Sequence, residues 1–230
     1  MTLYLSRLDL SQRPDVAALN ALLDPAPKGA QQDAHHRLIW SAFAGDPEAG
    51  RDFLWRAEGR GRFIVLSARP PQASALFDPP QVKPFAPDLR TGDRLRFVLR
   101  TNATRTRKGV GRVDVVMDAL HSVPQAERAT QRMAIAQGAA QDWLAGQGAR
   151  HGFQIAWDDD HDRPALAVDD YSVVALPAHR GKRQGQPQFG ILDLTGQIIV
   201  TDPAAFIDRL AAGFGRAKAF GCGLMLIRRA

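Results

Sequence analysis

Short strand-like runs and helical segments follow one another in the same order twice along this chain of 230 residues. In the first half, a partly alternating run at residues 2–10 precedes a helical pattern at 33–43, for which Asp33 is the predicted N-cap. The remaining predicted elements of this half are strands 52–57 and 62–67 joined by a glycine-containing turn, a helical turn at 74–77 and a strand at 81–85. This order is typical of a ferredoxin-like unit.

The second half repeats the order with longer elements. Residues 94–100 alternate between basic and apolar side chains, as expected of a half-exposed strand. The other predicted elements are a long helix at 124–146, strands at 153–157, 171–176 and 189–200, a helix at 203–212 capped by Asp202, and a strand at 223–229. We therefore predict an α+β protein of two tandem ferredoxin-like (RRM-like) domains, residues 1–88 and 89–230, with a C-terminal glycine-rich loop.

The excess of positive charge lies entirely in the second predicted domain. The chain has 30 Lys and Arg residues against 24 Asp and Glu residues, a formal net charge of +6. Residues 1–88 contain 10 basic and 10 acidic residues, whereas residues 89–230 contain 20 and 14. This excess favours a polyanion such as nucleic acid as the partner, with a solvated basic surface as an equal alternative on charge alone.

Basic side chains gather in two places. The first is a run without any acidic residue: Arg94, Arg96, Arg100, Arg105, Arg107, Lys108 and Arg112. Alternate arginines on a strand point from one face, where guanidinium groups can hold phosphate oxygens. The second cluster, residues 179–183, brings Arg180, Lys182 and Arg183 to the predicted hairpin tip between the strands at 171–176 and 189–200. Such a tip suits an RNA groove or the base of a stem, and a solubilising loop is the alternative.

A glycine-rich segment follows the predicted helix at 203–212. Gly213, Gly215, Gly221 and Gly223 flank Arg216 and Lys218. Glycines allow backbone amides to approach a phosphate closely. The segment is not a dinucleotide-binding fingerprint, because Lys218 occupies the third glycine position and a helix precedes the segment where a strand is required. It is not a P-loop either, because it lacks the Gly-Lys-Ser/Thr ending.

A few further residues bear on chemistry and compartment. His35, His36 and Arg37 place imidazoles beside an arginine, a weak signal for proton transfer near a phosphate. The acidic run at 158–162 is typical of a solvated turn, so we predict no metal site, and Cys222 is expected to pack rather than react. A single cysteine fits a reducing cytoplasm. We predict no secretory signal and no membrane helix, since no apolar run approaches about 18 residues.

The C-terminal sequence Gly-Phe-Gly-Arg-Ala-Lys-Ala-Phe-Gly-Cys-Gly-Leu-Met-Leu resembles the signature end of the CasE (also called Cse) family. These are the CRISPR RNA endonucleases of type I-E Cascade complexes. Other pieces follow in the family's order: His36-Arg37, Phe-Leu-Trp-Arg at 53–56, Lys-Pro-Phe at 83–85 and the run at 94–102. The resemblance spans nearly the whole chain. It implies recognition of a CRISPR repeat stem-loop in precursor RNA, with the protein remaining on its product beside other Cascade subunits.

The resemblance also implies a mechanism. The RNA's own 2′-hydroxyl attacks the adjacent phosphate at the 3′ base of the stem, without metal or cofactor, leaving a 2′,3′-cyclic phosphate or a 3′-phosphate. His36 matches the family's catalytic histidine, as base or as acid, and Arg37 matches a phosphate-binding arginine. Family members carry a tyrosine three residues before the histidine, where this chain has Asp33. His35 and Tyr171 are the candidates to replace it.

RNA contacts are therefore expected from many cations: Arg37, Arg94, Arg96, Arg105, Arg107, Lys108, Arg180, Lys182, Arg183, Arg216 and Lys218. One alternative is a non-catalytic stem-loop RNA-binding subunit of the same fold, whose site lapsed with the tyrosine. A more distant alternative is a general single-strand RNA binder that uses aromatic sheet positions. The low aromatic content of 7% weakens that alternative.

Overall fold

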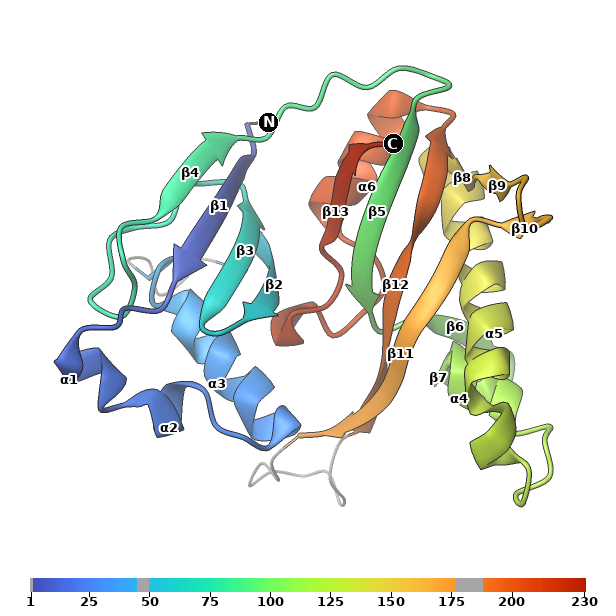
Figure 1. The fold of residues 1–230 in the computed structure, drawn as a ribbon, viewed down its shortest axis with the longest axis horizontal. Helices are drawn as coiled ribbons and strands as arrows, with labels where there is room; N and C mark the ends of the chain where they lie inside the picture. The colour runs from blue at the N-terminus through green and yellow to red at the C-terminus, as the bar shows by residue number, and fades with distance from the viewer. Residues whose placement is uncertain (1, 45–49, 177–187) are drawn as a thin grey trace.

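The computed structural model describes residues 2–44, 50–176 and 188–230. Figure 1 shows two sheets side by side, the first built by the N-terminal part of the chain and the second by the C-terminal part. Each sheet has helices on the face that points away from the other sheet. The space between the sheets is bounded by strand faces and by the loop that precedes the last strand.

The first sheet has the strand order β2-β3-β1-β4 with antiparallel neighbours. The elements of this half are β1 (Tyr4–Asp9), α1 (Pro14–Ala17), α2 (Asn20–Leu23), α3 (Lys28–Trp40), β2 (Phe53–Gly59), β3 (Arg62–Ser67) and β4 (Gln81–Pro84). Leu38 and Ile39 of α3 pack on Phe53, Trp55 and Phe63 of the sheet and form the core. Burial of these large side chains is the main stabilising contribution of this half.

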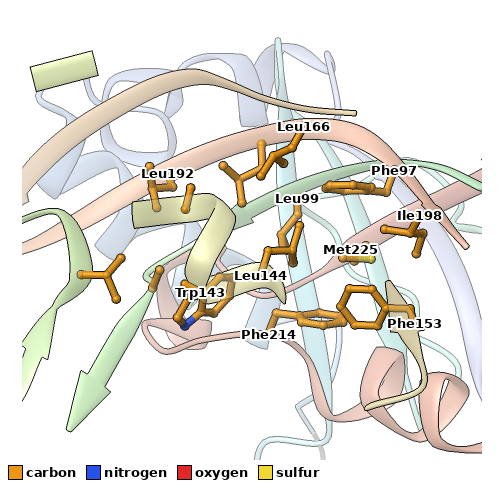
Figure 2. Packing of buried hydrophobic residues seen from close by; sticks show 14 of the residues in the cluster. Phe97, Leu99, Trp143, Leu144, Phe153, Leu166, Leu192, Ile198, Phe214 and Met225 are labelled. Carbon is orange, nitrogen blue, oxygen red and sulfur yellow. The ribbon is translucent and has the colours of Figure 1, made fainter. Parts of the chain in front are cut away.

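The second sheet has the order β11-β12-β5-β13, and β8 pairs with the far end of β12. Its main elements are β5 (Arg94–Thr101), α5 (Arg128–His151), β8 (Phe153–Ile155), β11 (Leu166–Ala175), β12 (Gln188–Val200), α6 (Pro203–Ala212) and β13 (Met225–Arg229). Figure 2 shows Phe97 and Leu99 of β5 meeting Trp143 and Leu144 of α5 in the core. Asp202 caps α6 as predicted, its Oδ1 accepting from Ala205 N at 3.1 Å.

Both sheets have the strand arrangement of a ferredoxin-like unit. In each unit the first strand lies between the third and the fourth, and the second strand forms the edge beside the third. The prediction of an α+β fold with two such units is confirmed. The helical turn predicted at 74–77 is wrong, because Phe77 forms a bridge to Leu10 and the chain there makes a non-helical turn.

The first long helix begins earlier than predicted. It starts at Lys28, and the position before it is Pro27, which makes no side-chain cap. Asp33 is therefore not an N-cap; it lies inside the helix, where its carboxylate pairs with Arg37 at 3.3 Å. An Asp–Arg pair one turn apart stabilises the interior of a helix. The sequence pattern around Asp33 is compatible with this role as well as with an N-cap.

A small hairpin and several short elements fall where the sequence predicted only a basic run or a connection. They are β6 (Thr104–Arg107), β7 (Gly111–Asp114), α4 (Val115–Leu120), β9 (Trp157–Asp158), β10 (Arg163–Pro164) and the 3₁₀ turn η1 (Lys218–Phe220). Asp114 caps α4, since its side chain accepts from the backbone N–H groups of Val116 and Met117. The hairpin and α4 project from the end of β5 toward the N-terminal part of α5 (Figure 1).

An apolar contact joins the two halves. Leu54 and Leu66 of the first sheet form one buried cluster with Leu224, and Leu226 packs against it. On the other side, the start of α3 touches the end of β11, where a Cβ on Gly29 would collide with the carbonyl of Ala175. The relative position of the sheets is thus held at both ends of the junction.

Candidate functional site

His36 lies where α3 meets η1. Its ring centroid is 6.1 Å from that of Phe220 and 6.4 Å from that of Trp40. The ring is half-buried, and its Nδ1 is buried without a hydrogen-bond partner among the residues that the structure describes. The histidine singled out by sequence resemblance is therefore placed at the junction of the two halves, with a ring nitrogen that the described fold does not use.

The surroundings of His36 favour its neutral form. Burial lowers the pKa of the imidazole below the ordinary histidine value, and the charge of Arg51 lowers it further. Asp33 and the backbone of Ala219 act in the opposite direction, whereas Arg37 again lowers the pKa. A neutral imidazole near pH 7 can accept a proton at one nitrogen.

Lys218 belongs to η1, whose residues Ala219 and Phe220 contact His36. Its Nζ donates to the carbonyl oxygen of Ala212 at 2.5 Å. Burial lowers the pKa of this lysine, and the charges of Arg209, Arg51 and Arg216 lower it as well. Several cations thus gather at one place, an arrangement that favours an anion there.

Arg51 is the residue that the sequence did not reveal. It acts electrostatically on both His36 and Lys218, and burial lowers its own pKa. A single arginine ahead of β2 belongs to no motif, and only the packing of β2 against η1 brings it to the site. The structure therefore adds Arg51 to the candidate residues.

Arg37 points from an exposed part of α3 and is paired with Asp33. Asp33 stands three residues before His36, where the resembling family has tyrosine. In this chain the side chain at that position forms an ion pair with Arg37, so it neutralises part of the charge predicted to hold phosphate.

Neither proposed replacement for the family tyrosine lies beside His36. His35 is buried, its Nε2 sits 2.9 Å from Asp24 Oδ1, and its ring packs edge-on against Phe63. Tyr171 donates its hydroxyl to Asp114 Oδ1 at 3.1 Å, beneath the guanidinium of Arg132 from α5. Tyr171 therefore lies on the α5 side of the second sheet, away from α3. In this structure neither side chain is placed beside His36 to stand in for the family tyrosine.

The glycine-rich segment holds the C-terminal loop against the first sheet. Gly213, Gly215, Gly221 and Gly223 have φ values of 75°, 68°, 75° and 97°, a region that favours glycine. A Cβ at Gly221 would lie 3.0 Å from the Trp55 ring. Several loop amides donate to backbone carbonyls: those of Phe214, Arg216 and Gly223. These three amides are therefore used within the fold.

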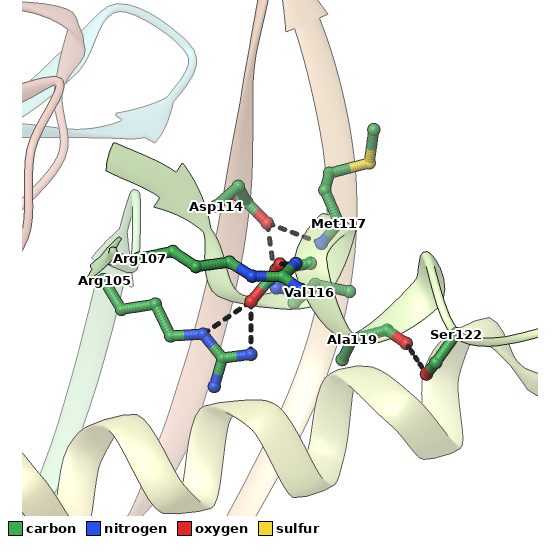
Figure 3. A network of polar contacts seen from close by, with 8 residues as sticks. Arg105, Arg107, Asp114, Val116, Met117, Ala119 and Ser122 are labelled. Atoms are coloured by element: carbon green, nitrogen blue, oxygen red, sulfur yellow. Dashed lines mark hydrogen bonds and ion pairs between the residues drawn. The ribbon is translucent and has the colours of Figure 1, made fainter. Parts of the chain in front are cut away.

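The basic run from 94 to 112 is less free of acidic partners than its sequence suggested. Asp118 of α4 accepts hydrogen bonds from Arg105 and Arg107 of β6. Figure 3 shows the side chains of Arg105 and Arg107 side by side next to α4. The pKa of the Asp118 carboxyl is lowered, and the hydrogen bond from Arg105 is the largest cause. These contacts fix both guanidinium groups on one side of the β6–β7 hairpin, while Lys108 lies exposed at its turn.

The arginines of β5 divide into two kinds. Arg100 makes two hydrogen bonds of 2.9 Å to Asp193 and is tied into the fold. Arg94 and Arg96 are exposed, and Arg94 donates to the carbonyl of Trp157 at 3.4 Å. The predicted cluster of Arg180, Lys182 and Arg183 lies outside the described residues.

Two sequence features remain outside the site. The run at 158–162 forms the end of β9 and its turn, where His161 pairs with Asp158 at 3.0 Å. Cys222 is fully buried, which raises the pKa of its thiol to about 12.

Among the described helices, none is long and apolar enough to cross a bilayer.

Comparison with known proteins gives consistent matches. The family model described as CRISPR associated protein matches residues 3–229. The CRISPR-associated endoribonuclease Cse3 of Thermus thermophilus is 27% identical over 228 residues, covering 90% of this chain and 96% of the relative. The CRISPR system Cascade subunit CasE of Escherichia coli is 26% identical over 199 residues, covering 83% of this chain and 88% of the relative.

A solved structure matches the fold over the same length. Thermus thermophilus Cse3, bound to an RNA representing a pre-cleavage complex, superposes with a TM-score of 0.68 and 23% identity, covering 99% of this chain and 100% of the other. At this identity the match concerns the arrangement of the chain. It agrees with the two ferredoxin-like units found here.

Proposed function

This chain belongs to the CRISPR-associated protein family, and from that premise we propose that it is an endoribonuclease for precursor CRISPR RNA. It recognises the repeat stem-loop, cuts at the 3′ base of the stem and stays on the mature RNA. The names of its relatives, an endoribonuclease and a Cascade subunit, support this proposal.

The observation that carries the proposal is the position of His36. A largely neutral imidazole stands against η1, the turn that also carries Lys218, and within the field of Arg51. An RNA phosphate held here would lie near both a proton-transfer group and fixed positive charge. Proton transfer and stabilisation of a developing anion are the two requirements of phosphoryl transfer from RNA.

The proposed reaction needs no metal. The 2′-oxygen forms a bond to the adjacent phosphorus, the bond from phosphorus to the 5′-oxygen breaks, and a 2′,3′-cyclic phosphate remains, which water can open to a 3′-phosphate. His36 either takes the proton of the 2′-hydroxyl or gives one to the departing 5′-oxygen. Lys218 and Arg51 stabilise the charge that builds on the phosphorane oxygens.

Stem recognition is assigned to the basic surfaces of the second half. The β6–β7 hairpin carries Arg105, Arg107 and Lys108, and contacts from Arg180, Lys182 and Arg183 are added from the sequence. Arg37, Arg94, Arg96 and Arg216 supply further phosphate contacts. Since the major groove of A-form RNA is deep and narrow, recognition rests largely on shape and phosphates.

We also propose the domain division at residues 88 and 89, with the catalytic histidine in the first domain and most RNA contacts in the second. We further propose that the protein stays on its product as a subunit of Cascade, as the name of its Escherichia coli relative supports, and that it works in the cytoplasm.

One observation favours a second candidate function. Asp33 stands in place of the family tyrosine and pairs with Arg37, so this chain lacks one hydroxyl and has partly neutralised one cation. A non-catalytic subunit that binds the stem-loop tightly without cutting would have such a site. The two candidates differ only in whether the RNA is cut.

The decisive experiment incubates the protein with its repeat RNA in EDTA, beside the same RNA with a 2′-deoxy nucleotide at the cut. We expect cutting in EDTA and none of the 2′-deoxy RNA, since that RNA lacks the nucleophile. Binding without cutting of either RNA supports the non-catalytic subunit. Cutting that EDTA abolishes overturns the proposed mechanism.

A further inference from the structure

Two arginines stand directly opposite each other on neighbouring strands of the second sheet. Arg228 of β13 pairs in register with Arg96 of β5, and Gln197 of β12 is the next residue in the same row. Like charges directly across a strand pair destabilise a sheet. A pair of this kind is therefore a cost to the fold unless an anion lies between the two guanidinium groups.

The row lies on the face of the sheet that points toward the first half. Phe97 and Leu99 alternate with Arg96 and are buried in the core with α5, so Arg96 points to the opposite side. Leu226, two residues before Arg228, packs against the apolar cluster that joins the sheets. Both arginines are exposed on this face.

A groove of about 420 Å³ runs over this row. Its lining combines the two arginines with apolar Val98 and Leu226 and the polar side chains of Thr195 and Gln197. Cations beside an apolar strip and hydrogen-bonding groups suit a ligand that alternates charged and flat apolar parts. Unpaired nucleic acid is such a ligand, with phosphates between bases and sugars.

Most of the other arginines that face this space pair with carboxylates of the fold, whereas Arg94 donates to the carbonyl of Trp157. The pairs are Arg7 and Arg62 with Asp9, Arg56 with Glu58, and Arg100 with Asp193. Arg96 and Arg228 have no carboxylate partner in residues 2–44, 50–176 and 188–230. Their charge is left for a ligand.

The groove is connected to the candidate active site by a single strand. β13 follows the glycine-rich loop that carries Lys218, and the chain from Leu224 to Arg228 covers roughly 13 Å at about 3.3 Å per residue. A few unpaired nucleotides can follow the strand over this distance.

We propose that this groove binds the unpaired RNA immediately downstream of the scissile phosphate, with a backbone phosphate between Arg96 and Arg228. The inference rests on the proposed function, because the scissile phosphate is taken to lie at His36. The RNA on the downstream side of the scissile phosphate would leave His36, pass η1 and continue along β13. The bound phosphate relieves the repulsion between the arginines, and Val98 and Leu226 contact a sugar or base.

The test measures binding of three RNAs that a 2′-deoxy nucleotide protects from cutting: the repeat hairpin alone, the hairpin with a downstream tail, and the hairpin with an upstream tail. The variant is Arg228→Ala. The matched control is Arg229→Ala, which removes the same charge one residue later, where the arginine already pairs with Asp93 at 3.3 Å.

For Arg228→Ala we expect about tenfold weaker binding of the downstream-tailed RNA, because one charge-assisted contact is lost. The salt dependence of that binding should fall by about 0.7 in logarithmic slope. Binding of the hairpin alone should not change, and the melting temperature should not fall, since the variant removes a repulsion. Arg229→Ala should show no loss that depends on the tail.

Each other outcome overturns the inference. Equal loss on all three RNAs places Arg228 on the stem, and loss on the upstream-tailed RNA alone places the other flank in the groove. No loss on any RNA, with loss of assembly into the larger complex, makes the groove a protein-binding surface. Failure of the unchanged protein to bind any of the hairpins would instead count against the proposed function itself.

Discussion

The imidazole of His36 and the phenyl ring of Phe220 lie 6.1 Å apart, centroid to centroid, although one belongs to the first long helix and the other to the loop before the last strand. The proposed active site is therefore assembled from both ends of the chain. The position of His36 depends on the packing of α3. The position of Lys218 relative to Arg51 depends on how the glycine-rich loop packs on β2.

Replacing His36 with alanine should remove cutting and leave RNA binding nearly unchanged. General acid–base catalysis contributes about 10²–10⁴-fold in rate, so single-turnover cleavage should fall by at least that range. Binding of the 2′-deoxy hairpin measures affinity separately. His161→Ala, in the exposed turn after β9, is the control and should retain both activities. Parallel loss of binding and cutting would show that His36 holds the RNA and transfers no proton.

Replacing Arg51 with alanine should raise the pKa of His36, because the arginine's charge now lowers it. The limb of the pH–rate profile that belongs to His36 should move to higher pH. A base must lose its proton, so the acidic limb would move; an acid must keep its proton, so the alkaline limb would move. Arg37→Ala should cause a smaller shift in the same direction, because Arg37 is the weaker of the two influences. If this limb of the pH–rate profile does not move, Arg51 does not act on the group that transfers the proton.

Replacing Gly221 with alanine should destabilise the protein and reduce cutting together. Gly221 has a φ of 75°, which costs a residue with a Cβ about 1–2 kcal/mol, and the new Cβ would also press on Trp55. Urea unfolding measures the loss. The control is Gly138→Ala in α5, where no atom lies within 4 Å of the new Cβ; helix propensity predicts a gain of about 0.5–1 kcal/mol. Equal stability of the two variants would contradict the docking of the loop on β2.

Replacing Tyr171 with phenylalanine should leave the cleavage rate unchanged. Its hydroxyl donates to Asp114 on the α5 side of the sheet, so its loss should cost only about 1 kcal/mol of stability. Burial raises the pKa of this phenol, and the neighbouring carboxylate of Asp114 raises it further. Single-turnover cleavage together with urea unfolding separates the two effects. A large drop in rate would return Tyr171 to the catalytic residues.

Much of the fold could be predicted from local patterns. Alternation in β5, the glycine turn between β2 and β3, and the Asp202 cap of α6 each depend on residues near one another in the sequence, and each was confirmed. The start of α3 was predicted wrongly, because its first turn carries neither a side-chain cap nor an apolar stripe. The turn at 74–77 depends on a partner in a distant segment, Leu10.

The candidate site was harder to predict for the same reason. His36 came from a resemblance, since its helix gave only a weak signal. Arg51 has no pattern of its own and acquires its role from the loop that packs beside it. The run from 94 to 112 seemed unpaired because its carboxylates, Asp118 and Asp193, come later in the chain. Ion pairs between residues far apart in the sequence cannot be predicted from a local run of basic residues.

The contact between α3 and η1 also sets the time during synthesis at which the proposed active site can form. His36 leaves the ribosome early, but Lys218 and Phe220 belong to the last part of the chain to be made. A nascent chain has no complete site until η1 and β13 have emerged and docked. A chain cut short before residue 213 would keep His36 and the β6–β7 hairpin but would lack Lys218 and Phe220, and with them the proposed active site.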